Sequence, residues 1–270
     1  MDKHIDQYLF LSPHLDDVVF SCGGFIYDLI NQKRAQVQIL TVFAGIPNSS
    51  LLSNLAKWFH GICGLGDNAI EIRRTEDNNA AQCLGGVTLH MNLPECLYRM
   101  DDSGCPRYLH EDNIFQSDPV SEINTLNEIV AALLDTVELK NFYKIYIPLG
   151  IGHHIDHLLL RKAVEYIVDS ATDTNLSKLN YYEDLPYACW DIEKNLQASI
   201  DKDMCPVLHI MNENSWRAKI NAILCYKSQL NALWTNGNKI DSILLSYALT
   251  VGLEKPAERF WIKNTKDLNC

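Results

Sequence analysis

The sequence lacks a long apolar run. No segment of its 270 residues approaches the roughly 20 consecutive apolar residues that cross a bilayer. Residues 1–7 also lack the basic start and the apolar stretch of a secretory signal peptide. We therefore expect a protein that neither spans a membrane nor is secreted, and we predict a cytoplasmic location.

Paired cysteines are lacking as well. The nine cysteines are scattered, none lies in a Cys-x-x-Cys arrangement, and their number is odd. Reduced thiols in a cytoplasmic protein explain this usage better than a disulfide framework. Cys22 lies beside the first motif described below. There it is either a neighbour of a metal ion or, as we expect, a small buried side chain.

Clustered basic residues and nucleotide-binding glycine motifs are also absent. The formal net charge is −11 and no Lys/Arg stripe occurs, although binding nucleic-acid phosphates requires clustered basic side chains. Neither a G-x-G-x-x-G nor a Walker pattern is present. We therefore expect no nucleic-acid partner. The acidic balance is compatible with a substrate that carries amines, and equally with solubility alone.

No linker rich in Pro, Gly or Ser divides the chain, so we expect one domain spanning residues 1–270. Predicted strands alternate with predicted helices. The strands are at 8–11, 36–43, 87–91, 144–148 and 178–182, and the helices are at 18–26, 51–64, 70–84, 118–139, 156–169 and 216–233. This alternation predicts a Rossmann-like, open and mostly parallel α/β sheet with helices on both faces and the active site at the C-terminal edge of the strands. Residues 191–211 have weak periodicity.

The first group of chemically useful side chains lies near the N-terminus. Residues 8–11 are apolar or aromatic and predict a buried strand that ends before Pro13. His14, Asp16 and Asp17 then follow at the edge where open α/β sheets place their ligand sites. A His and an Asp three residues apart can hold one metal ion and leave the Asp between them free. The alternative is a turn in which the acids cap the next helix.

A second group follows the predicted strand at 144–148. His153, His154, Asp156 and His157 lie close together just before a helical run. Surface histidine clusters without a function exist. Two strand-end clusters of metal-competent residues in one chain nevertheless favour a metal site.

Together the two motifs resemble those of the LmbE/PIG-L family of zinc-dependent N-acetylglucosaminyl deacetylases. The family's first motif is usually Pro-His-Pro-Asp-Asp-Glu, and its second is a Gly-His-x-Asp-His run. Segments similar to further family signatures start at Arg73, Tyr182, Tyr226 and Ala257. The resemblance therefore extends over most of the chain.

The first motif departs from the family pattern at two positions. Leu15 replaces the second Pro, and Val18 replaces the Glu. Neither position supplies a metal ligand in the family, but an acid that normally supports the site is missing. Some members also use a Tyr as an oxyanion donor, and the sequence does not locate its counterpart.

The resemblance implies a metal site formed by both motifs. It assigns His14, Asp17 and His157 as the ligands of one zinc ion per chain, although iron(II) suits the same donors. It also makes Asp16 the general base that takes a proton from the attacking water.

His154 resembles the family's second catalytic group, which stabilises the oxyanion or protonates the departing amine. Asp156 is expected to hold the His154 ring and to keep its pKa raised. His153 is the rival for the role of His154.

Two substrate contacts are implied as well. Arg73 matches a family position that contacts the sugar, and the alternative is an exposed ion pair with Glu76. Asp102 matches a position in a substrate-contacting Asp-Ser-Gly loop, and the alternative is an ordinary Asx turn. The helix at 51–64 forms either a wall of the substrate site or part of the core.

The resemblance implies hydrolysis of the N-acetyl group of an N-acetylglucosamine-type ring on a small soluble molecule. A non-catalytic zinc- or sugar-binding relative is one alternative, because an acid is missing at Val18. An esterase or another amidase on the same scaffold is a second.

Two classes of substrate remain open. One is an N-acetylated aminoglycoside antibiotic precursor, and the other is a thiol-cofactor precursor of the glucosaminyl-malate or glucosaminyl-inositol type. The acidic balance and four acids expected near the site favour the first class: Asp101, Asp102, Glu183 and Asp184. No membrane anchor is visible, which disfavours a lipid-linked glycoside. The sequence does not indicate the oligomeric state.

Overall fold

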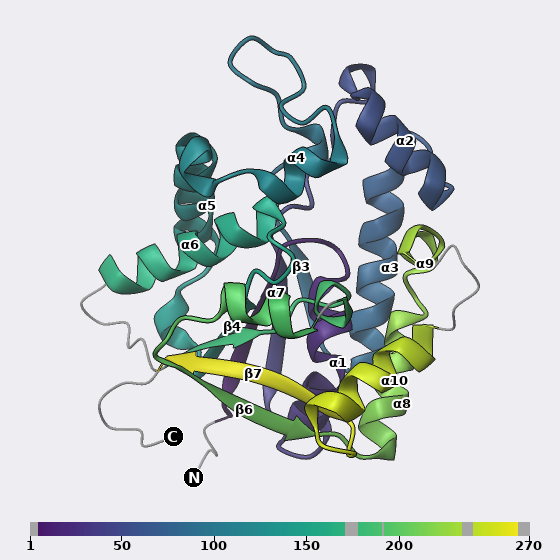
Figure 1. The fold of residues 1–270 in the computed structure, drawn as a ribbon, viewed down its shortest axis with the longest axis vertical. Coiled ribbons are helices and arrows are strands. Elements are labelled where there is room, and N and C mark those ends of the chain that lie inside the picture. Colours follow the sequence, from purple (N-terminus) through teal and green to yellow (C-terminus); the bar gives the residue numbers. More distant parts are fainter. Residues whose placement is uncertain (1–4, 171–177, 191, 234–239, 264–270) are drawn as a thin grey trace.

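A single open sheet forms the centre of the molecule. The computed structural model describes residues 5–170, 178–190, 192–233 and 240–263. Within these residues, seven strands form one sheet in the order β3-β2-β1-β4-β5-β7-β6 (Figure 1). They are β1 (Gln7–Ser12), β2 (Gln36–Thr41), β3 (Val87–His90), β4 (Lys144–Pro148), β5 (Leu179–Tyr182), β6 (Met204–Ile210) and β7 (Ala257–Lys263). Strands β1 to β5 pair in parallel, and β7 is antiparallel to β5 and β6. The mostly parallel α/β sheet expected from the sequence is confirmed.

Helices cover both faces of this sheet. They are α1 (Asp17–Asn31), α2 (Asn54–Cys63), α3 (Ala69–Leu84), α4 (Glu111–Gln116), α5 (Ile123–Thr136), α6 (Ile155–Ser170), α7 (Ile192–Ser199), α8 (Glu213–Ile223), α9 (Lys227–Leu233) and α10 (Ile240–Val251). Helices α1, α3 and α8 pack against one another, and α5 packs against α6 on the opposite face, as right-handed crossovers require. Among the described residues, no helix is long and apolar enough to cross a membrane.

The central strands are apolar along their whole length because helices cover them on both sides. Residues 8–12 of β1 and 145–148 of β4 are buried. The rings of Phe10 and Tyr146 stack across the two strands with centroids 4.5 Å apart. This pairing holds the two strands that precede the two motifs side by side.

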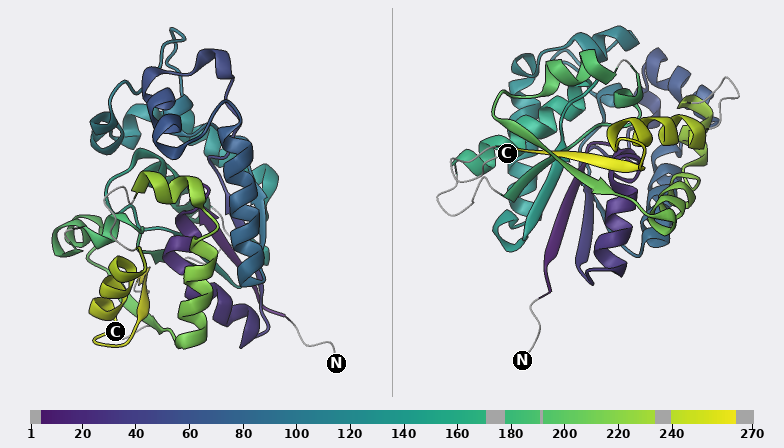
Figure 2. Two further views of the ribbon diagram at one scale, coloured as in Figure 1. Left: turned by 90° about the vertical axis from the view of Figure 1, so that its right-hand side faces the viewer. Right: turned by 60° about the horizontal axis from the view of Figure 1, so that its bottom comes forward.

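The order of the strands locates the site. From β1 the chain proceeds to β2 and β3 on one side, and from β4 it proceeds to β5 on the other. Successive connections therefore diverge between β1 and β4, which leaves a crevice at the carboxyl ends of these strands. Both motifs lie there, and α2 and α4 stand together beyond this end of the sheet (Figures 1 and 2).

Several elements differ from the sequence expectation. The helix expected at 118–139 begins as a 3₁₀ turn, η3 (Pro119–Glu122), before α5, and the helix expected at 216–233 is interrupted between α8 and α9. The weakly periodic stretch 191–211 contains α7 and β6, with Asp191 itself outside the described residues. Strand β6 forms because it pairs along its whole length with β7, which is remote in sequence.

Cysteine usage also differs in one respect. Among the described residues, seven cysteines are free, including the buried Cys22, whereas Cys205 is disulfide-bonded. The expectation of reduced thiols therefore does not extend to Cys205.

Candidate active site

The loop after β1 is a tight turn that aims His14 at the crevice. The hydroxyl of Ser12 donates to the His14 carbonyl at 2.6 Å and accepts from the Val18 amide at 3.2 Å. The His14 amide donates to the Asp17 carboxylate at 2.8 Å. These bonds use the polar groups of the turn itself to orient the first motif.

The loop between β4 and α6 brings in the second motif. Gly152 has a φ of +86°, and a Cβ there would lie 2.7 Å from the Tyr187 ring, so only glycine fits. After this turn His154 is buried and lines the cavity, whereas His153 is exposed and outside it. The structure thus brings His154, and not its rival His153, into the site.

Three histidine rings meet in the crevice. The centroids of His14, His154 and His157 are 4.8 to 5.2 Å apart. His14 Nε2 bonds to Asp156 Oδ2 at 2.9 Å, and His157 Nδ1 bonds to Asp184 Oδ1 at 2.6 Å. A carboxylate on one ring nitrogen orients the other nitrogen towards a metal ion. Both rings have this support although position 18 carries Val instead of an acid.

The donor atoms left over fit a metal ion. Asp17 Oδ2 lies 3.2 Å from His14 Nδ1 and 3.3 Å from His157 Nε2. Two ligand atoms on a tetrahedral zinc ion with bonds of about 2.0–2.1 Å are roughly 3.3 Å apart. Among the described residues, His157 Nε2 has no hydrogen-bond partner although it is fully buried. A buried nitrogen is rarely left without a partner, so this atom is suited to bind a cation.

The two adjacent carboxylates have different environments. Burial by itself would raise the pKa of Asp17, but the neighbouring His157 and His14 hold it well below its usual range. Burial, and then the negative charge of Asp17, raise the pKa of Asp16 to about 7. Asp17 therefore suits a permanently charged ligand, and Asp16 suits proton transfer near neutral pH.

The surroundings of His154 differ from the expectation. The Asp156 carboxylate binds His14 and also forms an ion pair with Arg99 at 2.5 Å, so it does not hold the His154 ring. Instead the backbone amide of Asp156 donates to His154 Nδ1 at 3.2 Å. Burial, and then the neighbouring His14, lower the pKa of His154 well below its usual value, whereas a raised pKa was expected. Because Nδ1 accepts the hydrogen bond of the Asp156 amide, these contacts fit a neutral ring with its proton on Nε2.

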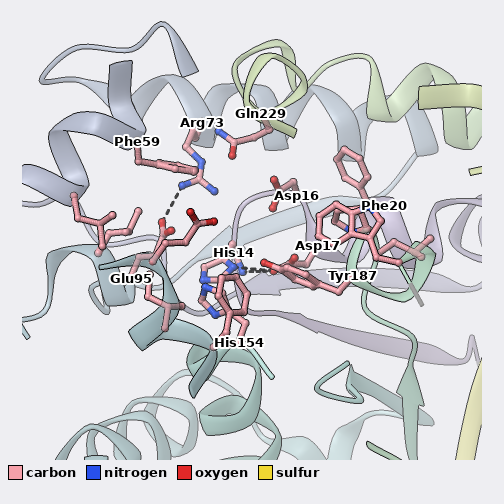
Figure 3. A pocket seen from close by; sticks show the side chains of 18 of the residues that line it. His14, Asp16, Asp17, Phe20, Phe59, Arg73, Glu95, His154, Tyr187 and Gln229 are labelled. Atoms are coloured by element: carbon pink, nitrogen blue, oxygen red, sulfur yellow. Dashed lines mark hydrogen bonds and ion pairs between the residues drawn. The ribbon is translucent and has the colours of Figure 1, made fainter. Parts of the chain in front are cut away.

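Above these groups lies a cavity with largely apolar walls (Figure 3). Its polar base contains His14, Asp16, Asp17 and His154. The walls come from α2, α4 and the segment after β5: Leu55, Trp58, Phe59, Glu111, Ile114, Phe115, Leu185, Pro186, Tyr187 and Trp190. Helix α2 is thus a wall of the cavity, which was one of the two alternatives for residues 51–64.

Arg73 extends from α3 into the cavity. Its Nη1 is 2.8 Å from Glu95 Oε2, and its Nε is buried without a hydrogen-bond partner among the described residues. Glu76 instead accepts hydrogen bonds from the amide and hydroxyl of Ser228. The alternative of an exposed pair between Arg73 and Glu76 is therefore excluded.

The acids expected near the substrate are elsewhere or already bonded. Asp102 is exposed and does not line the cavity, so its expected contact with substrate is not supported. Asp101 holds the turn through the amides of Ser103 and Cys105.

Glu183 and Asp184 are buried but engaged within the fold. Glu183 accepts from Tyr247, Arg259 and Trp261. Asp184 orients His157 and accepts from the amides of Gly150 and Ile151. Neither carboxylate is therefore available to a substrate.

Several functional residues were missed at the sequence level. Glu95 and Arg99 lie outside both motifs and have no distinguishing pattern around them. Tyr187 lies in the segment that starts at Tyr182, where the sequence assigned it no role, yet it lines the cavity with its ring centroid 5.5 Å from that of His157. Figure 3 shows its hydroxyl end directed towards His14 and Asp17.

Activation of water by a metal ion requires a set of ligands and a free carboxylate beside them, and this site offers both. The fold and the site together define a metal-dependent hydrolase. Within that class the chain belongs to the PIG-L family, because the family model described as GlcNAc-PI de-N-acetylase matches residues 9–168. It is therefore an amide hydrolase of the de-N-acetylase type.

Individual relatives are similar over nearly the whole chain. The 2'-N-acetylparomamine deacetylase of Niallia circulans is 27% identical over 277 residues, covering 98% of this chain and 94% of that protein. The 2'-N-acetylparomamine deacetylase of Streptomyces fradiae is 26% identical, covering 82% of this chain and 72% of its own length. The solved zinc inhibited form of teicoplanin deacetylase has a TM-score of 0.83 at 23% identity, covering 97% of this chain and 100% of that chain. The similarity to this solved structure concerns the fold alone.

Proposed function

We propose that this enzyme removes the acetyl group from an N-acetylglucosamine-type ring of a small aminoglycoside antibiotic precursor, using one zinc ion per chain. The observation that supports the metal assignment is the buried Nε2 of His157, which lies 3.3 Å from Asp17 Oδ2 and has no hydrogen-bond partner among the described residues. Iron(II) is the alternative metal for the same donors. The names of the two curated relatives support the aminoglycoside class over a thiol-cofactor precursor.

His14, Asp17 and His157 would hold the metal. The ion would polarise the acetyl carbonyl and make water a better nucleophile at neutral pH. Asp16 lies in the cavity beside the ligands and accepts the proton of the attacking water. It then delivers this proton to the departing nitrogen, so that acetate and a free amine are released.

The negative charge that develops on the acetyl oxygen needs donors. His154, neutral and protonated on Nε2, donates to it from one side of the cavity. The Tyr187 hydroxyl is the proposed second donor, in place of the Tyr that the sequence did not locate. Asp156 has a positioning role, because it orients His14 and is itself held by Arg99. Arg73 contacts the sugar with its Nε, which has no hydrogen-bond partner in the described part of the chain.

Domain organisation and location complete the proposal. We infer one domain over residues 1–270, supported by one buried core cluster that extends from Tyr8 to Trp261. We also infer a cytoplasmic location, as expected from the sequence.

The direct test measures acetate release from an N-acetylated aminoglycoside pseudodisaccharide, from N-acetylglucosaminyl-malate and from N-acetylglucosaminyl-inositol. We expect turnover to be fastest with the first, to stop on chelation and to return with zinc. Faster acetate release from the malate compound than from the pseudodisaccharide would contradict the substrate class but not the deacetylase reaction. Full activity after complete metal removal would contradict the mechanism.

A further inference from the structure

We propose that the mouth of the cavity binds a protonated amine on the part of the substrate beyond the N-acetylated ring, with Glu111 as its counter-ion. The mouth is defined by the exposed residues that line the cavity: Trp58, Glu111 and Trp190. This inference rests on the proposed function and specifies which feature of the substrate the enzyme selects.

Apart from Asp16, to which proton transfer is assigned, the charged side chains in the inner part of the cavity are paired with one another. The guanidinium of Arg73 forms an ion pair with Glu95, and Asp17 lies between His14 and His157. This part of the cavity therefore suits an uncharged group, as an N-acetylated sugar ring is.

Glu111 is in a different situation. It is exposed at the start of α4, and no hydrogen bond or ion pair to another described residue engages its carboxylate. The acids that the sequence had placed near the substrate are bonded within the fold or lie away from the cavity. Among the described residues at the mouth, Glu111 thus offers an unpaired carboxylate to an incoming substrate.

The two tryptophans add a second attraction for a cation. Trp58 on α2 is 51% exposed and Trp190 after β5 is 50% exposed. An ammonium near the face of an indole ring gains cation–π energy, and more so beside a carboxylate. A carboxylate combined with exposed indoles favours an aminated ring over a neutral polyol or an acid such as malate.

The test compares two substrates with the same N-acetylated ring, one joined to a diaminocyclitol and one joined to the neutral inositol. For Glu111→Gln we expect KM for the aminated substrate to rise about threefold to fivefold, as for an exposed ion pair, with kcat unchanged. KM for the inositol compound should stay the same. Asp112→Asn, at the next position of α4 and outside the cavity lining, is the matched control. An equal change for both substrates, or no change, would overturn the inference.

A binding measurement separates this inference from the proposed function. Calorimetry of the zinc-loaded enzyme with streptamine, a diaminocyclitol, should show weak binding that Glu111→Gln and added salt both reduce. Inositol should not bind. If no N-acetylglucosaminide is hydrolysed but streptamine binding depends on Glu111, only the proposed function fails. If hydrolysis proceeds while KM and streptamine binding are the same in Glu111→Gln as in the wild type, only the inference fails.

Discussion

Asp16 and Asp17 are adjacent in sequence, yet their side chains have different neighbours. Asp17 Oδ2 lies between two histidine nitrogens and accepts the amide of His14. Asp16 has no such histidine partners and lines the cavity. The position of Asp17 between two histidine nitrogens suits a metal ligand. The neighbouring Asp16 carboxylate is therefore the group that we assign to proton transfer.

We therefore expect Asp16→Asn to keep the metal and to lose activity by about 10²–10⁴-fold, because an amide cannot accept the proton of water. Asp17→Asn should instead weaken metal affinity, by more than the roughly 10–100-fold typical of supporting residues. Metal content by atomic emission and turnover at saturating zinc distinguish the two effects. Each variant is the control for the other, and equal metal loss in both would refute the division of roles.

At the scale of elements, the segment formed by the end of the α8–α9 connection and the first turn of α9 is fastened to α3 by buried polar bonds. The Tyr226 hydroxyl donates to Asp77 Oδ1 at 2.6 Å, and Glu76 accepts from the Ser228 amide and hydroxyl. The adjacent Gln229 lines the cavity. These bonds explain why the expected long helix at 216–233 is interrupted, because the chain turns there to meet the acids of α3.

Removal of one of these bonds should destabilise the fold measurably. We expect Tyr226→Phe to lower the free energy of unfolding by about 1.5–3 kcal/mol, since a buried, charge-assisted hydrogen bond is lost. Tyr166→Phe, at a tyrosine that is 61% exposed, is the control and should stay within about 0.5 kcal/mol of the wild type. Urea unfolding followed by circular dichroism measures both values. Equal stability of the two variants would show that the bond between α3 and this segment contributes little.

For the whole molecule, the metal site joins parts of the chain that are far apart in sequence. Its proposed ligands come from the loop after β1, the start of α1 and the first turn of α6, and Asp184, which orients one of them, follows β5. A metal ion bound there stabilises the folded state only, because the unfolded chain does not hold these groups together.

Zinc at about 100 times its dissociation constant should therefore stabilise the protein by about 2.7 kcal/mol, which raises Tm by several degrees. We expect a single thermal transition that shifts downward on chelation, as one domain with one site requires. Calorimetry with and without chelator measures this shift, and His157→Ala should abolish it. A zinc-induced shift that persists in His157→Ala would place the metal elsewhere.

The class of fold and the two motifs could be predicted from the sequence, because both depend on contiguous residues. Apolar strands such as 8–11 carry their own pattern, and His14, Asp16 and Asp17 follow one strand directly. The same local logic placed His154 and His157 after a second strand. The two motifs were expected to lie close together because parallel strands present their carboxyl ends at one edge of a sheet.

Which groups each of these residues faces depends on tertiary packing, and the sequence did not predict it. The partner of His14 is Asp156, which lies 142 positions away, and neither sequence spacing nor adjacency to His154 indicates that bond. Glu95, Glu111 and Tyr187 enter the cavity from separate loops and helices, whereas Asp102 is exposed outside it. Sequence patterns report the local backbone and the buried face of an element. The contacts of a polar side chain depend on how several elements pack, and that arrangement exists only in the folded molecule.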